Sequence, residues 1–214
     1  MPTMADGPFG FSAQEWRTLQ RLKTPQGIQR MLDSFGYHDA DTAWSPRRVL
    51  SEGRAHCCEG AVFAAAALRA IGKRPLVMDL EAERDDDHVI AVYRQGPSWG
   101  AIAKSHFTGL RDRAPIYRTL RELALSYFED YFNLRGSRTL RGYSRPVDLS
   151  RFDHLEWMTS QKPVWFIAEH LVDVPHARLL TPTQRRRLYP VDRLAVDAGL
   201  HGYGPYERRR GSSG

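Results

Sequence analysis

The sequence of 214 residues contains only two cysteines, which are neighbours at positions 57 and 58. A disulfide between adjacent residues closes a small ring that distorts the peptide between them, and no third cysteine is present to serve as a partner. We therefore expect two reduced thiols. This excludes the class of small secreted domains held together by disulfides and favours a reducing compartment.

Long apolar runs are also missing. No stretch approaches the roughly 18 to 20 apolar residues that a membrane-spanning helix needs. The first residues, MPTMADGPFGFSAQEW, lack the basic and apolar segments of a signal peptide. These two absences predict a cytoplasmic protein with no membrane partner.

Motifs that hold cofactors and metals are absent as well. The sequence has no phosphate loop, no dinucleotide fingerprint and no H-E-x-x-H helix. The adjacent cysteines do not form the C-x2-C knuckle of zinc sites, and no second pair exists. We therefore expect no cofactor and no metal.

The net charge of +6 is concentrated in two short basic tracts, at 185–187 and 208–210. Aromatic residues do not alternate with these arginines, and no nucleic-acid motif accompanies them. Solvated surface charge is therefore the better interpretation, and we expect no nucleic-acid partner. Binding that weakens steeply with salt would be the sign of the alternative.

The apolar periodicity predicts both helices and strands. In chain order we expect helices over 12–22, 24–35 and 57–71, strands over 74–80, 88–94 and 99–105, and helices over 115–132, 162–174 and 181–194. Ser12 and Glu15 have capping-box spacing, and Thr24 and Pro25 form a second helix start. A loop or short helix precedes the cysteines, and an extended loop is expected over 144–153. The predicted fold class is α+β.

The organisation along the chain predicts a single domain over 1–214. We expect a helical N-terminal part (1–50), a core (51–135), a packed C-terminal extension (136–207) and a loose basic tail (208–214). Trp165, Phe166 and Leu171 are the expected apolar anchors of the extension.

Cys57 stands where the alanine-rich helix over 57–71 should begin. A helix N-terminus stabilises a thiolate, which is the nucleophilic form of cysteine. Cys58 is rotated by about 100° around the helix axis and is expected to serve packing. A small buried residue is the simpler alternative for Cys57 itself. His88 opens a predicted strand, and it is the best candidate to accept the thiol proton.

These residues resemble a known family. The spacing Cys57, Arg69, Gly72 and Pro75, followed by H88VIAVY and W99GAIA, is similar to the transglutaminase-like superfamily over about residues 50–107. The longer segment from TPQGIQRMLD to LRELALSYFEDYF resembles uncharacterised bacterial members of that superfamily. The resemblance implies a papain-like core, in which the cysteine helix packs on an antiparallel sheet of three or more strands, flanked by helices.

The resemblance also implies acyl transfer through a thioester on Cys57, with His88 as general base and acid. The substrate would be an amide or an ester, including one within a protein or peptide. Hydrolysis would make the chain a hydrolase or peptidase, and transfer to an amine would make it a transglutaminase.

The sequence departs from this family at the third catalytic position. The residue that orients the histidine is acidic or an amide in the family, and here that position is Ala103. Asp86, which shares strand parity with His88, and Ser105 are the candidate substitutes. The alternative is a catalytically inactive module that binds or scaffolds.

Several neighbouring residues are weaker candidates. Glu59 fits a first-turn acid favoured by the helix dipole, or a residue that touches substrate or His88. His56 either caps the helix or lines the cleft. Trp99 is expected to pack against the cysteine helix, and the resemblance implies that it borders the oxyanion site. The run Asp85 to Asp87 is typical of a solvated turn, and His106 is a reserve histidine.

Overall fold

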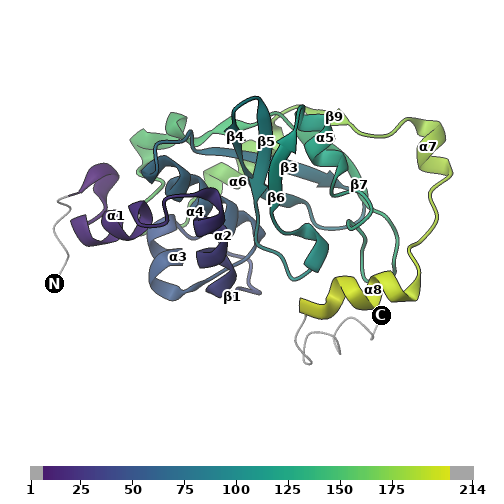
Figure 1. The fold of residues 1–214 in the computed structure, drawn as a ribbon, viewed down its shortest axis with the longest axis horizontal. Coiled ribbons are helices and arrows are strands. Elements are labelled where there is room, and N and C mark those ends of the chain that lie inside the picture. The colour runs from purple at the N-terminus through teal and green to yellow at the C-terminus, as the bar shows by residue number, and fades with distance from the viewer. Residues whose placement is uncertain (1–6, 203–214) are drawn as a thin grey trace.

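The computed structural model describes residues 7–202, and this part of the chain folds around a seven-stranded sheet (Figure 1). Its strands are β3 (Leu76–Ala82), β4 (His88–Gln95), β5 (Ser98–Ile102), β6 (Arg113–Tyr117), β7 (Leu140–Ser144), β8 (Val147–Asp148) and β9 (His176–Arg178). The order across the sheet is β6-β5-β4-β3-β7-β9, and β8 also pairs with β3. Every pairing in this sheet is antiparallel. The predicted α+β class is confirmed at this level.

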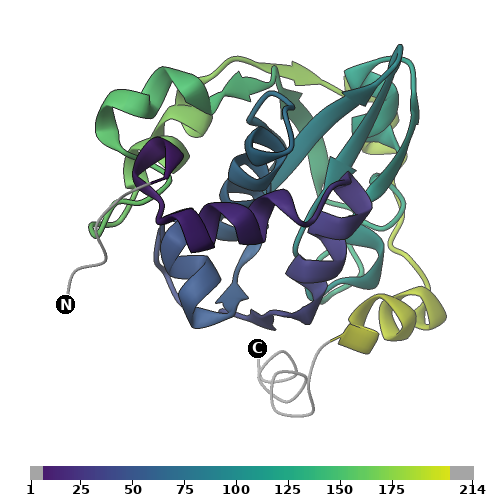
Figure 2. The same ribbon diagram turned by 60° about the vertical axis from the view of Figure 1, so that its left-hand side comes forward.

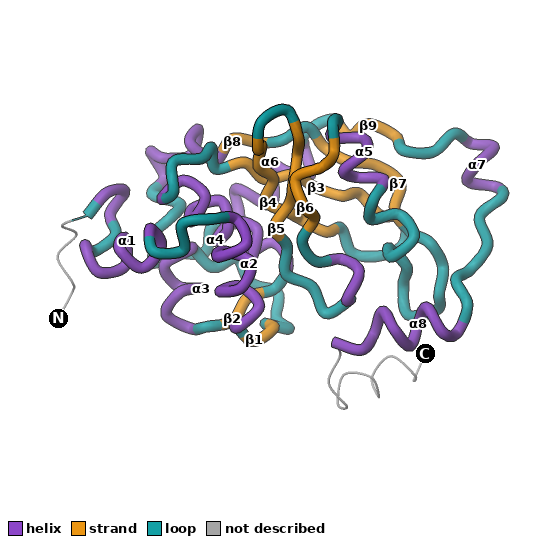
Figure 3. The backbone as a smooth tube through the Cα atoms, viewed as in Figure 1, coloured by secondary structure: helices purple, strands orange, loops and turns teal. Residues whose placement is uncertain are grey.

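Helices cover both faces of the sheet (Figures 1 and 2). They are α1 (Ala13–Gln20), α2 (Pro25–Ser34), α3 (Pro46–Glu52), α4 (Cys57–Ala70), α5 (Leu120–Leu125), α6 (Trp165–Asp173), α7 (Pro182–Arg186) and α8 (Arg193–Gly199). A short parallel pair, β1 (Gly36–Tyr37) and β2 (Arg54–Ala55), lies among the N-terminal helices, as the tube in Figure 3 shows.

The strands have two apolar faces because both are covered. Val77 and Ala91 face the cluster built around α4, whereas Met78 and Ile90 face the cluster built around α5 and the tyrosines that follow it. This alternation follows from the two-residue period of a strand. Nearly all of α4 is buried, and its run of alanines allows the helix backbone to approach the sheet closely.

The two N-terminal helix starts are confirmed. The Ser12 hydroxyl accepts a hydrogen bond from the Glu15 N–H at 3.2 Å, and the Glu15 carboxylate accepts one from the Ser12 N–H at 2.7 Å. The Thr24 hydroxyl accepts from the Gly27 N–H at 3.0 Å. Both motifs satisfy N–H groups that have no partner inside the helix.

The helix predicted over 115–132 is wrong in its first and last parts. Residues up to Tyr117 form β6, an edge strand, where a proline is tolerated. The helix α5 begins after the Thr119 cap and ends at Leu125, and the chain then turns so that Tyr127 and Tyr131 enter the core.

The C-terminal predictions also need correction. The helix predicted over 181–194 is two helices, α7 and α8, separated at Pro190, and the Thr181 cap is confirmed. The segment 144–153 carries β8 and a 3-10 helix instead of a plain loop. Leu171 is buried, but Trp165 is 39 % exposed and does not anchor the extension. The tail predicted over 208–214 lies outside the described residues.

Within residues 7–202, the structure contains no helix that is long and apolar enough to cross a membrane.

Candidate active site

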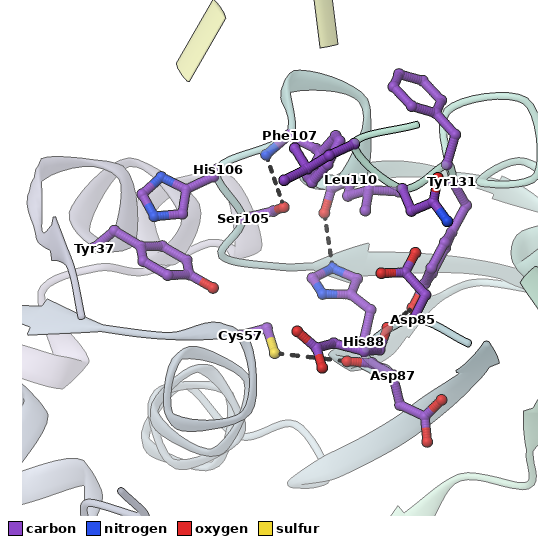
Figure 4. Close-up of a pocket in the computed structure, with 14 residues that line it drawn as sticks. Tyr37, Cys57, Asp85, Asp87, His88, Ser105, His106, Phe107, Leu110 and Tyr131 are labelled. Carbon is purple, nitrogen blue, oxygen red and sulfur yellow. Dashed lines mark hydrogen bonds between the residues drawn. The ribbon is translucent and has the colours of Figure 1, made fainter. Parts of the chain in front are cut away.

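Cys57 is the first residue of α4 and lines a pocket of about 200 Å³ (Figure 4). The pocket walls come from β1, the start of α4, the β3–β4 turn, the start of β4, the segment after β5 and the segment that follows α5. The Cys57 thiol points to the Asp87 carbonyl oxygen, 3.9 Å from Sγ. A molecule in the pocket could therefore contact both the Cys57 sulfur and the residues from Asp85 to His88.

His88 lines the same pocket and is 4 % exposed. Its Nε2 lies 2.9 Å from the Leu110 carbonyl oxygen. A carbonyl oxygen can only accept a hydrogen bond, so Nε2 carries the proton and Nδ1 keeps a lone pair. Within residues 7–202, no hydrogen bond to Nδ1 accompanies this one.

Every buried side-chain nitrogen and oxygen of the described residues has a hydrogen-bond partner. Since Nδ1 of His88 has none, this atom must reach the open space of the pocket. Figure 4 shows it turned to the side on which Cys57 and Tyr37 lie.

Two tyrosines fix the plane of the His88 ring. Tyr127 and Tyr131 present edge contacts to it, each with ring centroids 6.4 Å apart. The Tyr127 hydroxyl donates to the Arg111 carbonyl at 3.0 Å, and the Tyr131 hydroxyl donates to the Asp86 carbonyl at 2.8 Å. The ring is therefore held by packing as well as by Leu110.

Burial sets the charge state of the pair. It raises the pKa of the Cys57 thiol to about 11, against hydrogen bonds from backbone N–H groups and with the help of nearby negative charge on Asp79 and Asp86. Burial lowers the pKa of His88 to about 4, against its bond to Leu110 and with the help of the Arg113 charge. At neutral pH the site therefore holds a neutral thiol and a neutral imidazole.

The two residues predicted as substitutes for the orienting residue form no hydrogen bond with the His88 ring. Asp86 is exposed, and its carbonyl serves Tyr131. The Ser105 hydroxyl accepts from the Phe107 N–H at 3.0 Å. The acceptor for His88 is the Leu110 main chain, which no residue identity could have revealed because every residue has a carbonyl.

Ala103, the position predicted for a third catalytic residue from the resemblance, makes structural contacts through its backbone. The backbone of Ala103 forms two buried hydrogen bonds with Gln29, from its N–H to Oε1 at 3.1 Å and from Nε2 to its carbonyl at 3.0 Å. These bonds attach the end of β5 to α2. The backbone at position 103 therefore holds α2 against the sheet, and its methyl side chain offers no group that could orient His88.

Glu59 supports the start of α4 instead of touching His88. Its carboxylate is 1 % exposed and accepts from the Thr42 hydroxyl at 2.6 Å, the Trp44 N–H at 2.9 Å and the His38 ring at 3.0 Å. Burial raises the pKa of Glu59, but the Thr42 hydrogen bond, the charge of His56 and the other donors outweigh it, and the net shift is downward.

His56 precedes the helix as its N-cap residue. Its Nε2 donates to the Thr42 carbonyl at 2.7 Å, and its backbone N–H donates to Glu59 at 3.3 Å. His56 is not among the residues that line the pocket. It and Glu59 together fix the segment that leads into Cys57.

Trp99 lies away from the pocket, and its predicted contact with the cysteine helix is wrong. It packs on the sheet face opposite α4, because strand parity places it with Ala101. Trp99 also pairs with Arg94 of β4. Arg94 lies six residues after His88, which corresponds to about 20 Å along the strand. Cys58 packs against the α4 core, as predicted.

Tyr37 and His106 form the pocket wall opposite the β3–β4 turn (Figure 4). Their ring centroids lie 3.6 Å apart. His106 therefore contributes an aromatic face to the site, while His88 is the histidine that opens the strand. Tyr37 was not among the predicted residues, because a tyrosine in a two-residue strand gives no sequence signal.

Among residues 7–202, no group of three or more histidine, cysteine or acidic side chains is placed to hold a metal ion. No family model matches the chain, and no curated protein matches it. The assignment of function therefore rests on the geometry of the pocket.

Proposed function

We propose that the protein is a cysteine-dependent acyl-transfer enzyme with a papain-like, transglutaminase-like core. One observation carries the proposal: Nε2 of His88 is bound by the Leu110 carbonyl, so Nδ1 is left as a base in the pocket that Cys57 lines. A nucleophile, a base and a group that orients the base are the parts such chemistry requires. Two unpaired thiols fit a cytoplasmic setting.

Because the Cys57 thiol and the His88 imidazole are both neutral, the thiol proton is transferred during the attack on the substrate and not before it. As Sγ of Cys57 attacks an amide or ester carbonyl, Nδ1 of His88 accepts the thiol proton. The Cys57 backbone N–H, at the start of α4, is placed to stabilise the negative charge that develops on the carbonyl oxygen.

The tetrahedral intermediate then collapses. The C–N or C–O bond breaks, and the leaving amine or alcohol takes the proton from His88, which leaves a thioester on Cys57. Water or an amine attacks this thioester through the same base. A neutral carbonyl at Leu110 stabilises the transient imidazolium less than a carboxylate would, so we expect a slow enzyme.

The second candidate is a module that binds or scaffolds without catalysis. The raised pKa of the Cys57 thiol favours it, because a thiol that is not ionised at neutral pH is not an activated nucleophile. The two candidates differ in whether His88 governs acylation.

Acyl-enzyme trapping separates them. The protein is mixed with p-nitrophenyl esters, quenched in acid and weighed by intact mass spectrometry. The enzyme predicts one acyl group on Cys57, unchanged in Cys58→Ala, absent in Cys57→Ala and slowed by about 10²-fold or more in His88→Gln. Acylation at the same rate with and without His88 would support the non-catalytic module.

A further inference from the structure

A second cavity, of about 630 Å³, adjoins the Cys57 pocket. The two share three lining residues, Asp85, Asn133 and Leu134. The two cavities are therefore neighbours, and we call the second one the arginine groove. It is lined by Arg84, Arg135, Arg138 and Arg141.

The groove lies between two turns that are bound to each other. The Glu83 N–H donates to the Thr139 carbonyl at 2.9 Å, and the Thr139 hydroxyl donates to the Asp85 carboxylate at 2.7 Å. The C-terminal segment braces the second turn, since the Val191 N–H donates to the Gly136 carbonyl at 2.8 Å. The groove is thus built from fixed main chain, and substrate would not have to order it.

The acidic groups of the groove are already engaged. Glu83 is paired with Arg141 at 2.8 Å and also with Arg185. Asp85 accepts from Thr139. On the pocket side, Asp87 accepts from the Ala82 N–H at 2.7 Å, and Asp86 is exposed, as are Asp85 and Asp87.

Two of the four arginines that line the groove have no acidic partner among the described residues. Arg138 is paired with Glu129, but Arg84 and Arg135 are exposed and have no carboxylate partner within residues 7–202. Arg84 also has a left-handed backbone conformation, with φ of 57°, which glycine or asparagine adopts with less strain. Arg84 and Arg135 therefore line the groove with guanidinium groups that no described carboxylate engages.

We propose that the arginine groove binds carboxylate groups of the acyl substrate, as found in an acidic peptide, while the reacting carbonyl lies at Cys57. This rests on the function proposed above. Guanidinium groups hold carboxylates through paired hydrogen bonds, which makes Arg84 and Arg135 the specificity residues. Asp86, nearer the thiol, keeps negative charge away from the reacting carbon itself.

Two electrophilic peptides test this in the Cys58→Ala protein. Chloroacetyl-Ala-Ala-Glu-Glu-amide and chloroacetyl-Ala-Ala-Gln-Gln-amide differ in charge alone. In both, Sγ of Cys57 displaces chloride to form a thioether, and the thiol proton passes to solvent. The rate of Cys57 labelling is followed by intact mass spectrometry at low salt.

We expect the Glu peptide to react about fivefold faster, and the preference to vanish in Arg84→Gln/Arg135→Gln and at high salt. The Gln peptide should react equally in both proteins. The matched control is Arg17→Gln/Arg21→Gln, which removes the same charge from exposed positions at α1 and should keep the preference.

Equal rates for two peptides that both label Cys57 would overturn the groove proposal and leave the nucleophile standing. A preference lost equally in the control variant would show an effect of net charge and would also overturn it. If neither peptide labels Cys57, the proposed function fails, and the groove proposal fails with it.

Discussion

The neutral state of the Cys57 thiol can be measured directly. In Cys58→Ala the remaining thiol should titrate near its pKa of about 11, so about one molecule in 10³ is ionised at pH 8. An ordinary thiol of pKa about 8.5 is about a quarter ionised at that pH. We therefore expect iodoacetamide to react with Cys57 about 10²-fold more slowly than with N-acetylcysteine.

The pH profile gives the sharper readout. The alkylation rate should rise about tenfold per pH unit from 7 to 10 without a plateau, because only the thiolate reacts. His88→Gln should leave this profile nearly unchanged, since His88, with a pKa of about 4, is uncharged over the whole range. The Cys57→Ala/Cys58→Ala protein reports the background that does not come from a thiol. A plateau between pH 6 and 8 that disappears in His88→Gln would reveal a thiolate–imidazolium pair and refute the argument from burial.

Three further predictions concern stability, each measured by urea unfolding. Glu59→Ala leaves several buried donors without an acceptor and should lower the free energy of unfolding by roughly 3–5 kcal/mol, whereas exposed Glu169→Ala should change it by less than about 0.5 kcal/mol; similar losses in both would contradict the Glu59 network. Gly60→Ala places Cβ 2.6 Å from Cβ of Lys104, so a loss of about 1–3 kcal/mol should outweigh the helix-propensity gain of about 1 kcal/mol; a net gain would show that the helix can shift. Burial raises the pKa of Asp79 to about 6, so the folded state favours its protonated form. The contribution of Asp79 to the free energy of unfolding should therefore fall as pH rises from about 4 to 6, by a few kcal/mol at most. An identical pH profile of stability in Asp79→Asn would rule this out.

Local signals in the sequence predicted much of the fold. The caps at Ser12 and Thr24 and the strand opened by His88 depend on neighbouring residues, and each lies where it was expected. The helix over 115–132 failed because its periodicity spans an edge strand, a cap and a turn, and only sheet pairing decides among these. Tertiary context overrides a helical pattern when the same residues can complete a sheet.

The sequence predicted that Cys57 and His88 lie in one site, but it did not predict the contacts that support them. Cys57 and His88 line one pocket, as their positions at a helix start and a strand start suggested. Trp99 was misplaced because alternation assigns a face only after the register is known. Glu59 and Leu110 act through contacts with segments far away in sequence, which composition and spacing do not encode.

The bond between His88 and Leu110 has a consequence for how such sites arise and are found. Every residue has a main-chain carbonyl. A substitution at position 110 therefore leaves the acceptor for His88 in place as long as the backbone there keeps its conformation. For the enzyme proposed above, the lack of an acid or amide at position 103 need not abolish activity, because the main chain orients the imidazole. A survey that classifies proteins as active or inactive from the identities of three catalytic residues would classify an enzyme with a main-chain acceptor as inactive.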